Sequence, residues 1–360
     1  SMRPPNADPA MEAWSTLVVR HNRGRPVSVQ QPENTDFVEL VIKFEDTVRL
    51  FEAVHESAHW VVTLDRYIRR EQIERLETKP DILTVKERVG SNSLYTLIVS
   101  SNVGRRFIID RLERKLVNIA EIDGGPIHDE SVTRELAESI YDETRKIFPR
   151  LALQAMGISR VTEEILGLII ARHVAEQEYP MLIADGVIAW ISLDEHQDWF
   201  SGANASRADL CRITMERCEG KLYVDVLVVE GKLRQVYDPH GVEQVMTTLS
   251  LLEGFLTCGD HEMVDAKLWR EYLLSAIETT NPEARFVKGP SEHELRGGRR
   301  QLPADLRDLF REGDFKLRSL NGVYSICRYD QNGHFTIESI DERVQVAKSF
   351  RNGIIELIDS

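Results

Sequence analysis

The feature that most constrains the fold is an apolar run that ends in two charged residues. Residues 222–229 read Leu-Tyr-Val-Asp-Val-Leu-Val-Val, a composition that predicts a buried central strand. Glu230, Gly231 and Lys232 follow directly. Because side chains alternate along a strand, Glu230 and Lys232 are expected on the same face. A carboxylate and an ammonium group rarely share a buried face unless they are paired or bound to something, so this strand end is the first candidate site.

A second strand-like segment, residues 208–213, carries an acid at the corresponding end. It reads Ala-Asp-Leu-Cys-Arg-Ile, and a turn-like Cys-Glu-Gly at 218–220 separates it from the apolar run. If the two strands pair, Asp209 lies beside Glu230. Two carboxylates with a neighbouring lysine suit a hydrated Mg²⁺ ion that handles a phosphate. The alternative is that a Glu-x-Lys triplet, which is common, sits on a solvated face.

An acid on one strand followed by Glu-x-Lys on the next resembles the PD-(D/E)xK nuclease superfamily. The resemblance implies that Asp209 and Glu230, with the backbone carbonyl of Gly231, bind the metal, and that Lys232 is the catalytic lysine. The residue before the acid is Ala208, where the family motif has proline. The implied function is a Mg²⁺-dependent DNA endonuclease, with Mn²⁺ able to substitute for Mg²⁺.

A helix is expected immediately before these strands. Apolar residues recur at helical spacing from Ser159 to about Glu178 and predict one buried stripe. Glu164 lies at the edge of that stripe. In the nuclease superfamily the helix before the sheet often supplies a further acid, so Glu164 is expected as an additional catalytic residue. The alternative is a first-turn glutamate that complements the helix dipole.

The order of elements predicts an α/β fold with a mixed central sheet flanked by helices. After Lys232, Asp238-Pro239 marks the start of a helix that should cover the sheet. Helix, strands and helix in this order are those of a restriction-endonuclease-like core, expected over residues 129–280. An N-terminal α/β domain is expected over residues 11–122, and a small β-rich module over residues 302–360.

The C-terminal module is expected to be a meander of hairpins. Asn321-Gly322 and Asn332-Gly333 separate alternating runs and are typical hairpin dipeptides. Asp185-Gly186 predicts a further hairpin, between strands at 181–184 and 187–193. Residues 281–303 are rich in charge, glycine and proline and are expected to form a linker.

Other segments suggest nucleic-acid contacts but have simpler interpretations. Basic residues crowd the predicted helix at 105–119 and could bind phosphate, but a solvated face opposite the apolar stripe is the favoured interpretation, because no phosphate-binding glycine motif lies around the helix. The basic run 296–300 is open to the same two interpretations. Trp199 and Phe200, in the loop before Asp209, could stack on bases or pack beneath the loop.

Charge and hydropathy limit the remaining possibilities. The chain has 360 residues, a formal net charge of −14 and 42% hydrophobic residues, which is enough for packed cores and argues against a broadly basic surface. No apolar stretch is long enough for a membrane span. The four cysteines form no C-x-x-C pair, so reduced thiols and a cytoplasmic location are expected.

The flanks are similar to parts of large HerA/FtsK-type ATPases of phage-defence systems, such as the helicase component of phosphorothioation-dependent restriction. The segments concerned are residues 63–66, 95–101 and 160–164. No Walker A loop occurs in the sequence. DNA and an ATPase or helicase, as a separate subunit or further domain, are therefore the expected partners, and a homo-oligomer is compatible with the sequence. The alternative function is a catalytically inactive nuclease-like module that binds DNA or docks on a motor complex.

Overall fold

The computed structural model describes most of the chain after residue 46. The described residues are 47–63, 70–77, 79–88, 94–121, 130–155, 160–181, 183, 185–194, 196, 207–234, 238–259, 263–280, 285–287, 302–350 and 354. Residues 11–46 of the predicted N-terminal domain, the aromatic pair 199–200 and the basic run 296–300 lie outside them. Among the helices that are described, none is long and apolar enough to cross a membrane.

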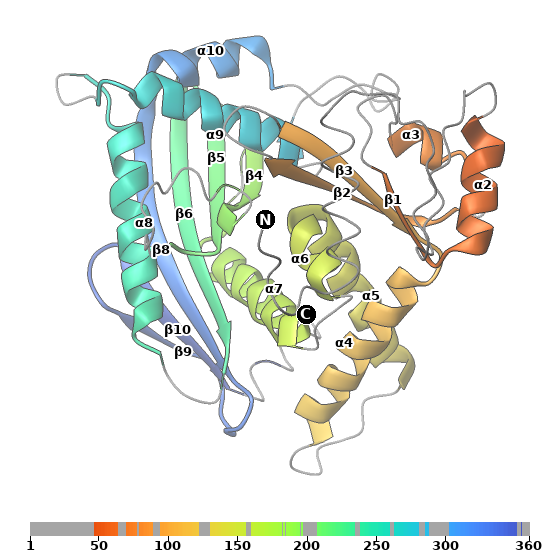
Figure 1. Cartoon of the computed structure of the whole chain (residues 1–360). Helices are drawn as coiled ribbons and strands as arrows, with labels where there is room; N and C mark the ends of the chain where they lie inside the picture. The colour runs from red at the N-terminus through yellow and green to blue at the C-terminus, as the bar shows by residue number, and fades with distance from the viewer. Residues whose placement is uncertain are drawn as a thin grey trace, which may run out of the picture. The chain divides into compact units, whose positions relative to one another are not determined.

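The described strands form two sheets (Figure 1). The smaller is antiparallel, in the order β1-β3-β2, with β1 (Trp60–Thr63), β2 (Asp81–Arg88) and β3 (Leu94–Ser101). The larger is seven-stranded and mixed, in the order β7-β4-β5-β6-β8-β10-β9. Its strands are β4 (Gly186–Ser192), β5 (Leu210–Cys218), β6 (Lys221–Leu233), β7 (Arg285–Val287), β8 (Lys316–Arg328), β9 (Thr336–Ser339) and β10 (Val344–Phe350).

The helices of the described part surround these sheets. They are α2 (Thr47–Ser57), α3 (Arg70–Ile73), α4 (Gly104–Glu121), α5 (Glu130–Ile147), α6 (Pro149–Ala155), α7 (Arg160–Glu178), α8 (His240–Leu256), α9 (Ala266–Thr280) and α10 (Ala304–Glu312). A mixed α/β fold, with a mixed sheet flanked by helices, is therefore confirmed.

The hairpin of β5 and β6 is the centre of the large sheet. A two-residue turn joins Cys218 to Lys221, with Glu219 and Gly220 both at positive φ, 51° and 78°. This is the turn geometry whose twist matches that of paired strands, and it sets the register of the whole hairpin. The β-branched and apolar residues of β6 are buried on both faces, as the sequence predicts.

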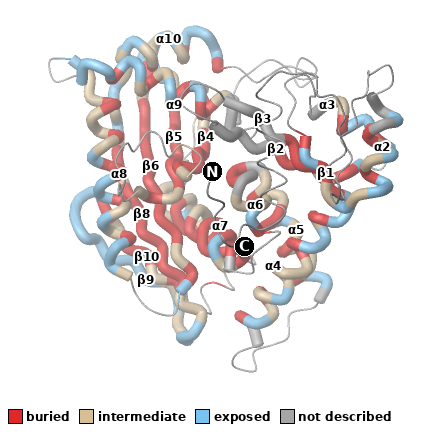
Figure 2. Tube along the Cα trace, viewed as in Figure 1, coloured by how far each residue is buried: buried red, intermediate tan, exposed pale blue. Residues whose placement is uncertain are grey.

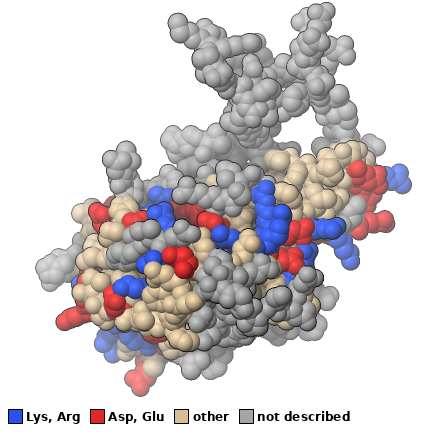
Figure 3. Space-filling view, turned by 90° about the horizontal axis from the view of Figure 1, so that it is seen from below, with Lys and Arg blue, Asp and Glu red and all other residues tan. Residues whose placement is uncertain are grey.

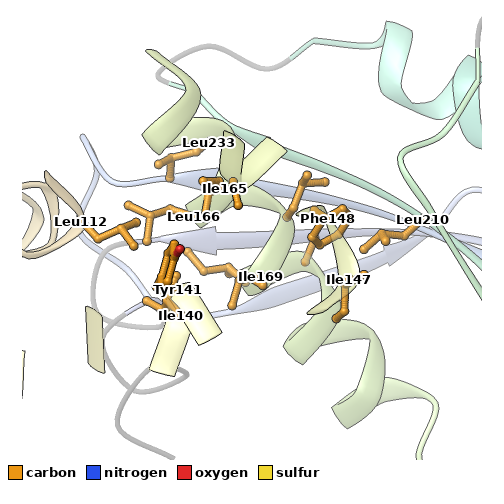
Figure 4. Close-up of a cluster of buried hydrophobic side chains, with 14 of the residues drawn as sticks. Leu112, Ile140, Tyr141, Ile147, Phe148, Ile165, Leu166, Ile169, Leu210 and Leu233 are labelled. Atoms are coloured by element: carbon orange, nitrogen blue, oxygen red, sulfur yellow. The ribbon is translucent and has the colours of Figure 1, made fainter. Parts of the chain in front are cut away.

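The two faces of β6 lie in different hydrophobic clusters. Leu227, Val229 and Leu233 belong to the cluster beneath α7, whereas Val226 and Val228 belong to the cluster beneath α8. Figure 2 shows the buried strands as a continuous layer between these helices. Figure 4 shows apolar side chains of the first cluster, from the helices that precede the sheet and from the sheet itself. Each such side chain, when fully buried, contributes about 1.5–3 kcal/mol.

The C-terminal segment completes the same sheet. β8 runs parallel to β6 from Tyr223 to Leu233, and β10 runs parallel to β8. The described residues, which lie between 47 and 354, belong to one compact unit. The predicted boundary between residues 129–280 and 302–360 therefore separates strands of one sheet, since β4, β5 and β6 lie before it and β8, β9 and β10 after it.

Three local predictions are wrong for identifiable reasons. β8 passes straight through Asn321-Gly322, because Gly322 packs under α8 and is not in a turn. Asp185-Gly186 does not join two short strands: β4 begins at Gly186 and pairs with β5, while Met181 and residue 183 are outside any strand. Within the predicted linker, Arg285–Val287 forms β7 at the edge beside β4.

Candidate functional site

The register of the central hairpin brings Asp209 and Glu230 side by side. Leu210 pairs with Val229 at the end of the β5–β6 ladder, so the next residues along, Asp209 and Glu230, are cross-strand neighbours. The Gly231 backbone N–H donates a hydrogen bond to Asp209 Oδ2 at 3.1 Å. The structure thus brings together Asp209, Glu230 and Gly231, as the sequence predicts.

Glu230 and Lys232 project toward the face covered by α8. Their positions alternate with those of Gly231 and Leu233, which face α7. Lys232 forms an ion pair with Glu230 Oε1. The Glu230 side chain is 0% exposed and that of Lys232 is 22% exposed, so the site is reached from the side of the lysine.

Glu230 is an unusual group to find at full burial. Its Oε1 contacts the Lys232 ammonium group, but within the described part of the chain neither carboxylate oxygen accepts a well-directed hydrogen bond. Buried carboxylates are normally hydrogen-bonded, because removal from water is costly. Among the described residues, Glu230 is therefore a buried carboxylate that has an ion pair with Lys232 but accepts no well-directed hydrogen bond.

The pKa values of the three charged groups are displaced together. Burial, reinforced by the charge of Asp209 and only partly offset by Lys232, raises the pKa of Glu230 well above its usual range. Burial also raises the pKa of Asp209, against the effect of Lys232. For Lys232, burial lowers the pKa, but the charges of Asp209 and Glu230 outweigh it, so the net shift is upward. Lys232 is accordingly protonated at neutral pH.

Helix α8 holds the start of β5 in place. The Ala208 backbone N–H donates to Thr248 Oγ1 at 2.9 Å, and Gln244 Nε2 donates to the Arg207 carbonyl at 2.8 Å. Thr248 is 0% exposed within an otherwise apolar stripe. Sequence reasoning missed both residues, although a threonine among the buried positions of α8 was a detectable signal, since a buried hydroxyl needs a partner.

Gly231 allows α7 to approach β6 closely. A Cβ at this position would lie 2.8 Å from both the Ala171 Cβ and the Gly167 carbonyl oxygen. A Cβ added at Gly167 would likewise lie only 3.0 Å from the backbone nitrogen of Leu233. The middle residue of the Glu-x-Lys triplet is therefore glycine for reasons of packing.

Glu164 is not brought to this site. It lies on α7, which packs on the Gly231 face of β6, whereas Glu230 and Lys232 project from the opposite face. Ala171 of α7 lies against Gly231, and Gly167, one turn earlier in the helix, lies against Leu233 at the end of β6. Glu164 is almost one turn earlier again, so it lies beyond the end of the strand, and its side chain is exposed. The structure therefore gives no support to the expected arrangement, in which α7 supplies an acid to the site.

A further ion pair lies beside the site. Arg207 Nη2 donates to Asp194 Oδ1 at 2.5 Å. Asp194 follows β4, and its negative charge is among the smaller influences that raise the pKa of Asp209, after burial. Three acidic residues therefore lie near the ends of three neighbouring strands, together with two basic residues. The acidic residues are Asp194, Asp209 and Glu230, and the basic residues are Arg207 and Lys232.

The residues present fit a hydrated divalent ion with few protein ligands. No group of three or more His, Cys, Asp or Glu side chains in the described part is placed to hold a metal ion. Asp209 and Glu230 nevertheless provide two hard carboxylate ligands, and Mg²⁺ commonly uses one or two carboxylates while water and substrate phosphate complete its shell. The incomplete hydrogen bonding of Glu230 is the observation that agrees with such a ligand.

Comparisons with known proteins identify no relative. No family model matches the chain, and no curated protein or solved structure matches it. Function must therefore be argued from the site itself.

The basic helix α4 is engaged within the protein. Arg105 contacts Glu138 and Asp142, and Lys115 Nζ lies 2.5 Å from Glu163 Oε1. Arg111 donates to the Ala155 carbonyl at 2.7 Å. Of the two interpretations of this helix, a charged face satisfied by intramolecular contacts is the one that these interactions support.

Proposed function

We propose that the chain is a divalent-metal-dependent phosphodiesterase that cleaves DNA, with Asp209, Glu230 and Lys232 in the roles implied by the PD-(D/E)xK resemblance. The single observation that carries the proposal is the fully buried Glu230 carboxylate, which accepts no well-directed hydrogen bond among the described residues and lies beside Asp209 and Lys232. The order of α7, β4 to β6 and α8 supports it, because it reproduces a helix, strands, helix core.

The carboxylates of Asp209 and Glu230, with the Gly231 carbonyl, would hold Mg²⁺ or Mn²⁺. What such an ion supplies when bound is polarisation of a phosphate oxygen and a lowered pKa for a bound water. Lys232, whose raised pKa keeps it protonated, stabilises the negative charge that develops on the phosphate oxygens. Its charge also holds Glu230 in place through the ion pair. Lys232 is thus better suited to charge stabilisation than to removing a proton from water.

The test is a cleavage panel over plasmid, linear duplex and single-stranded DNA, with Mg²⁺, with Mn²⁺ and with EDTA. We expect cleavage that requires the metal and falls by at least about a hundredfold in Asp209→Asn, since both metal binding and positioning are lost. Equal cleavage in EDTA, or by the variant, would show that another site is responsible.

The alternative is a nuclease-like module that binds DNA or docks on a motor without cleaving. The observation that favours it is the ion pair between the fully buried Glu230 and Lys232, which gives the carboxylate a charged partner in the absence of metal. Calorimetric titration with Mn²⁺ separates the two proposals. Heat from the parent protein that disappears in Glu230→Gln supports the metal site, whereas no heat from the parent supports the docking module. On either proposal, an ATPase or helicase is the partner that we infer from the flanking resemblance.

A further inference from the structure

Arg207 is a charged group beside the site that the proposed chemistry does not use. Its guanidinium group has five N–H donors, and within the described part of the chain Nη2 alone makes a hydrogen bond, to Asp194 Oδ1. Its Nε is buried without a hydrogen-bond partner among the described residues. The side chain is 23% exposed, so its outer edge is open to a ligand.

The backbone at Arg207 is held by hydrogen bonds to helix α8. Its carbonyl accepts a hydrogen bond from Gln244, and the next N–H, that of Ala208, donates to the buried Thr248 hydroxyl. Asp209 follows one residue later and contacts Gly231. The backbone position from which the Arg207 side chain extends is therefore fixed, two residues before Asp209, a proposed metal ligand.

The present partner of Arg207 is a weak competitor. Asp194 is 45% exposed, and ion pairs between partly exposed groups contribute little to stability. A phosphodiester offers the planar guanidinium group two acceptor oxygens in a bidentate contact, which is stronger. A phosphodiester near the site would therefore compete with Asp194 for the guanidinium group.

The rest of the surface makes such a contact important. The net charge is −14, and basic and acidic side chains are interspersed on the face shown in Figure 3. A protein of this charge binds DNA through few phosphate contacts, so each one accounts for a large share of the affinity.

We propose that Arg207 binds a backbone phosphate of DNA next to the one at Asp209 and Glu230, and that Asp194 holds Arg207 in its place until DNA arrives. The inference rests on the proposed function and deepens it by naming a substrate contact. On this proposal Asp194 lowers the affinity of the protein for DNA, because it competes with the phosphate for Arg207.

Binding is measured by the fluorescence anisotropy of a short fluorescein-labelled DNA duplex in EDTA, over a series of salt concentrations. We expect Arg207→Ala to weaken binding about tenfold and to reduce the log–log salt slope by about one, the signature of one lost phosphate contact. Arg207→Lys should lie between the parent and the alanine variant. Asp194→Asn should tighten binding about threefold, because the competing charge is removed.

Arg343→Ala and Glu253→Gln form the matched control, because these residues make an exposed ion pair on other elements. Neither should alter the salt slope as Arg207→Ala does. Tighter binding by Asp194→Asn cannot result from a damaged fold, so that variant decides the matter if Arg207→Ala does not fold.

An unchanged salt slope in Arg207→Ala, or weaker binding by Asp194→Asn, would overturn the inference. If the parent cleaves DNA with Mn²⁺ while both variants bind like the parent, the Arg207 contact is wrong and the proposed function stands. If the variants shift binding as expected but the parent does not cleave, the phosphate contact stands and the nuclease proposal fails. A parent that neither binds nor cleaves DNA overturns both.

Discussion

Gly322 of β8 lies directly beneath Val245 of α8. A Cβ added at position 322 would be 2.3 Å from Val245 Cγ1 and 3.0 Å from Leu249 Cδ1. Contacts this short are not tolerated, and both neighbours belong to the buried core. The close approach of helix and sheet therefore depends on the absence of a side chain at position 322.

We expect Gly322→Ala to lower the free energy of unfolding by about 1–3 kcal/mol, the usual cost of overfilling a packed core. Urea denaturation measures the change. Adding Val245→Ala to Gly322→Ala should restore part of the loss, because it removes the atom that the new methyl group meets. Ser250→Ala, on the exposed side of α8, should stay within about 0.5 kcal/mol of the parent. Independent, additive effects of the two substitutions would contradict the contact.

Replacing Glu230 by its neutral isostere should stabilise the protein in the absence of metal. The pKa of Glu230 is raised in the folded state, so its contribution to stability is present at low pH and is lost as pH rises through the raised value. Glu230→Gln should therefore melt at a higher temperature than the parent, by a margin that grows with pH, in EDTA.

In Mg²⁺ or Mn²⁺ the melting temperature of the parent should rise above that of Glu230→Gln, since only the parent gains stability from the ion. The control is Glu164→Gln, an exposed glutamate on the other side of the sheet, which should keep the parent's metal-dependent shift. A variant at Glu230 that still gains stability from metal would show that Glu230 is not a ligand.

The Asp225–Arg318 pair should contribute measurably to the pairing of β6 with β8. Arg318 Nε donates to both Asp225 oxygens at 3.0 Å, and Ser319 Oγ donates to Oδ1 at 2.7 Å. We expect Asp225→Asn to cost about 1–3 kcal/mol in unfolding free energy, because a buried set of charge-assisted hydrogen bonds is broken. Glu216→Gln removes an outer contact of the same arginine and should cost clearly less. Equal losses from the two substitutions would be inconsistent with this difference in burial.

His173 should make stability depend on pH near neutrality. A hydrogen bond with the Glu143 carboxylate, and the charge of that group, raise the pKa of His173 above its ordinary value of 6.5. A histidine whose pKa is raised by folding stabilises the fold fully at pH values below its ordinary pKa. This contribution is lost as the pH rises through the pKa that the histidine has in the folded state. The melting temperature of the parent should therefore exceed that of His173→Gln at acidic pH, and the two should converge above neutrality. A constant difference across this range would rule out the protonated pair.

The proximity of Asp209 and Glu230 could be predicted because it depends on local rules. A short turn sets the hairpin register, and period-two alternation sets the face. Glu164 could not be placed by the same means. A stripe such as Val161 and Ile165 identifies the buried side of a helix, but it does not say which face of a sheet that side covers. The Asn321-Gly322 dipeptide misled for a related reason, since the glycine serves a contact with a helix far away in the sequence.

The parallel pairing of β6 and β8 also fixes an order of events during synthesis. α8, α9, β7 and α10 lie between the two strands in the chain, so this contact has a high sequence separation and forms late. Until residues 316–328 have emerged from the ribosome, one of the most apolar strands of the protein is an open edge, free to pair with another unfinished chain. A product that ends before Lys316 should for this reason aggregate, although both proposed carboxylate ligands are already present in it.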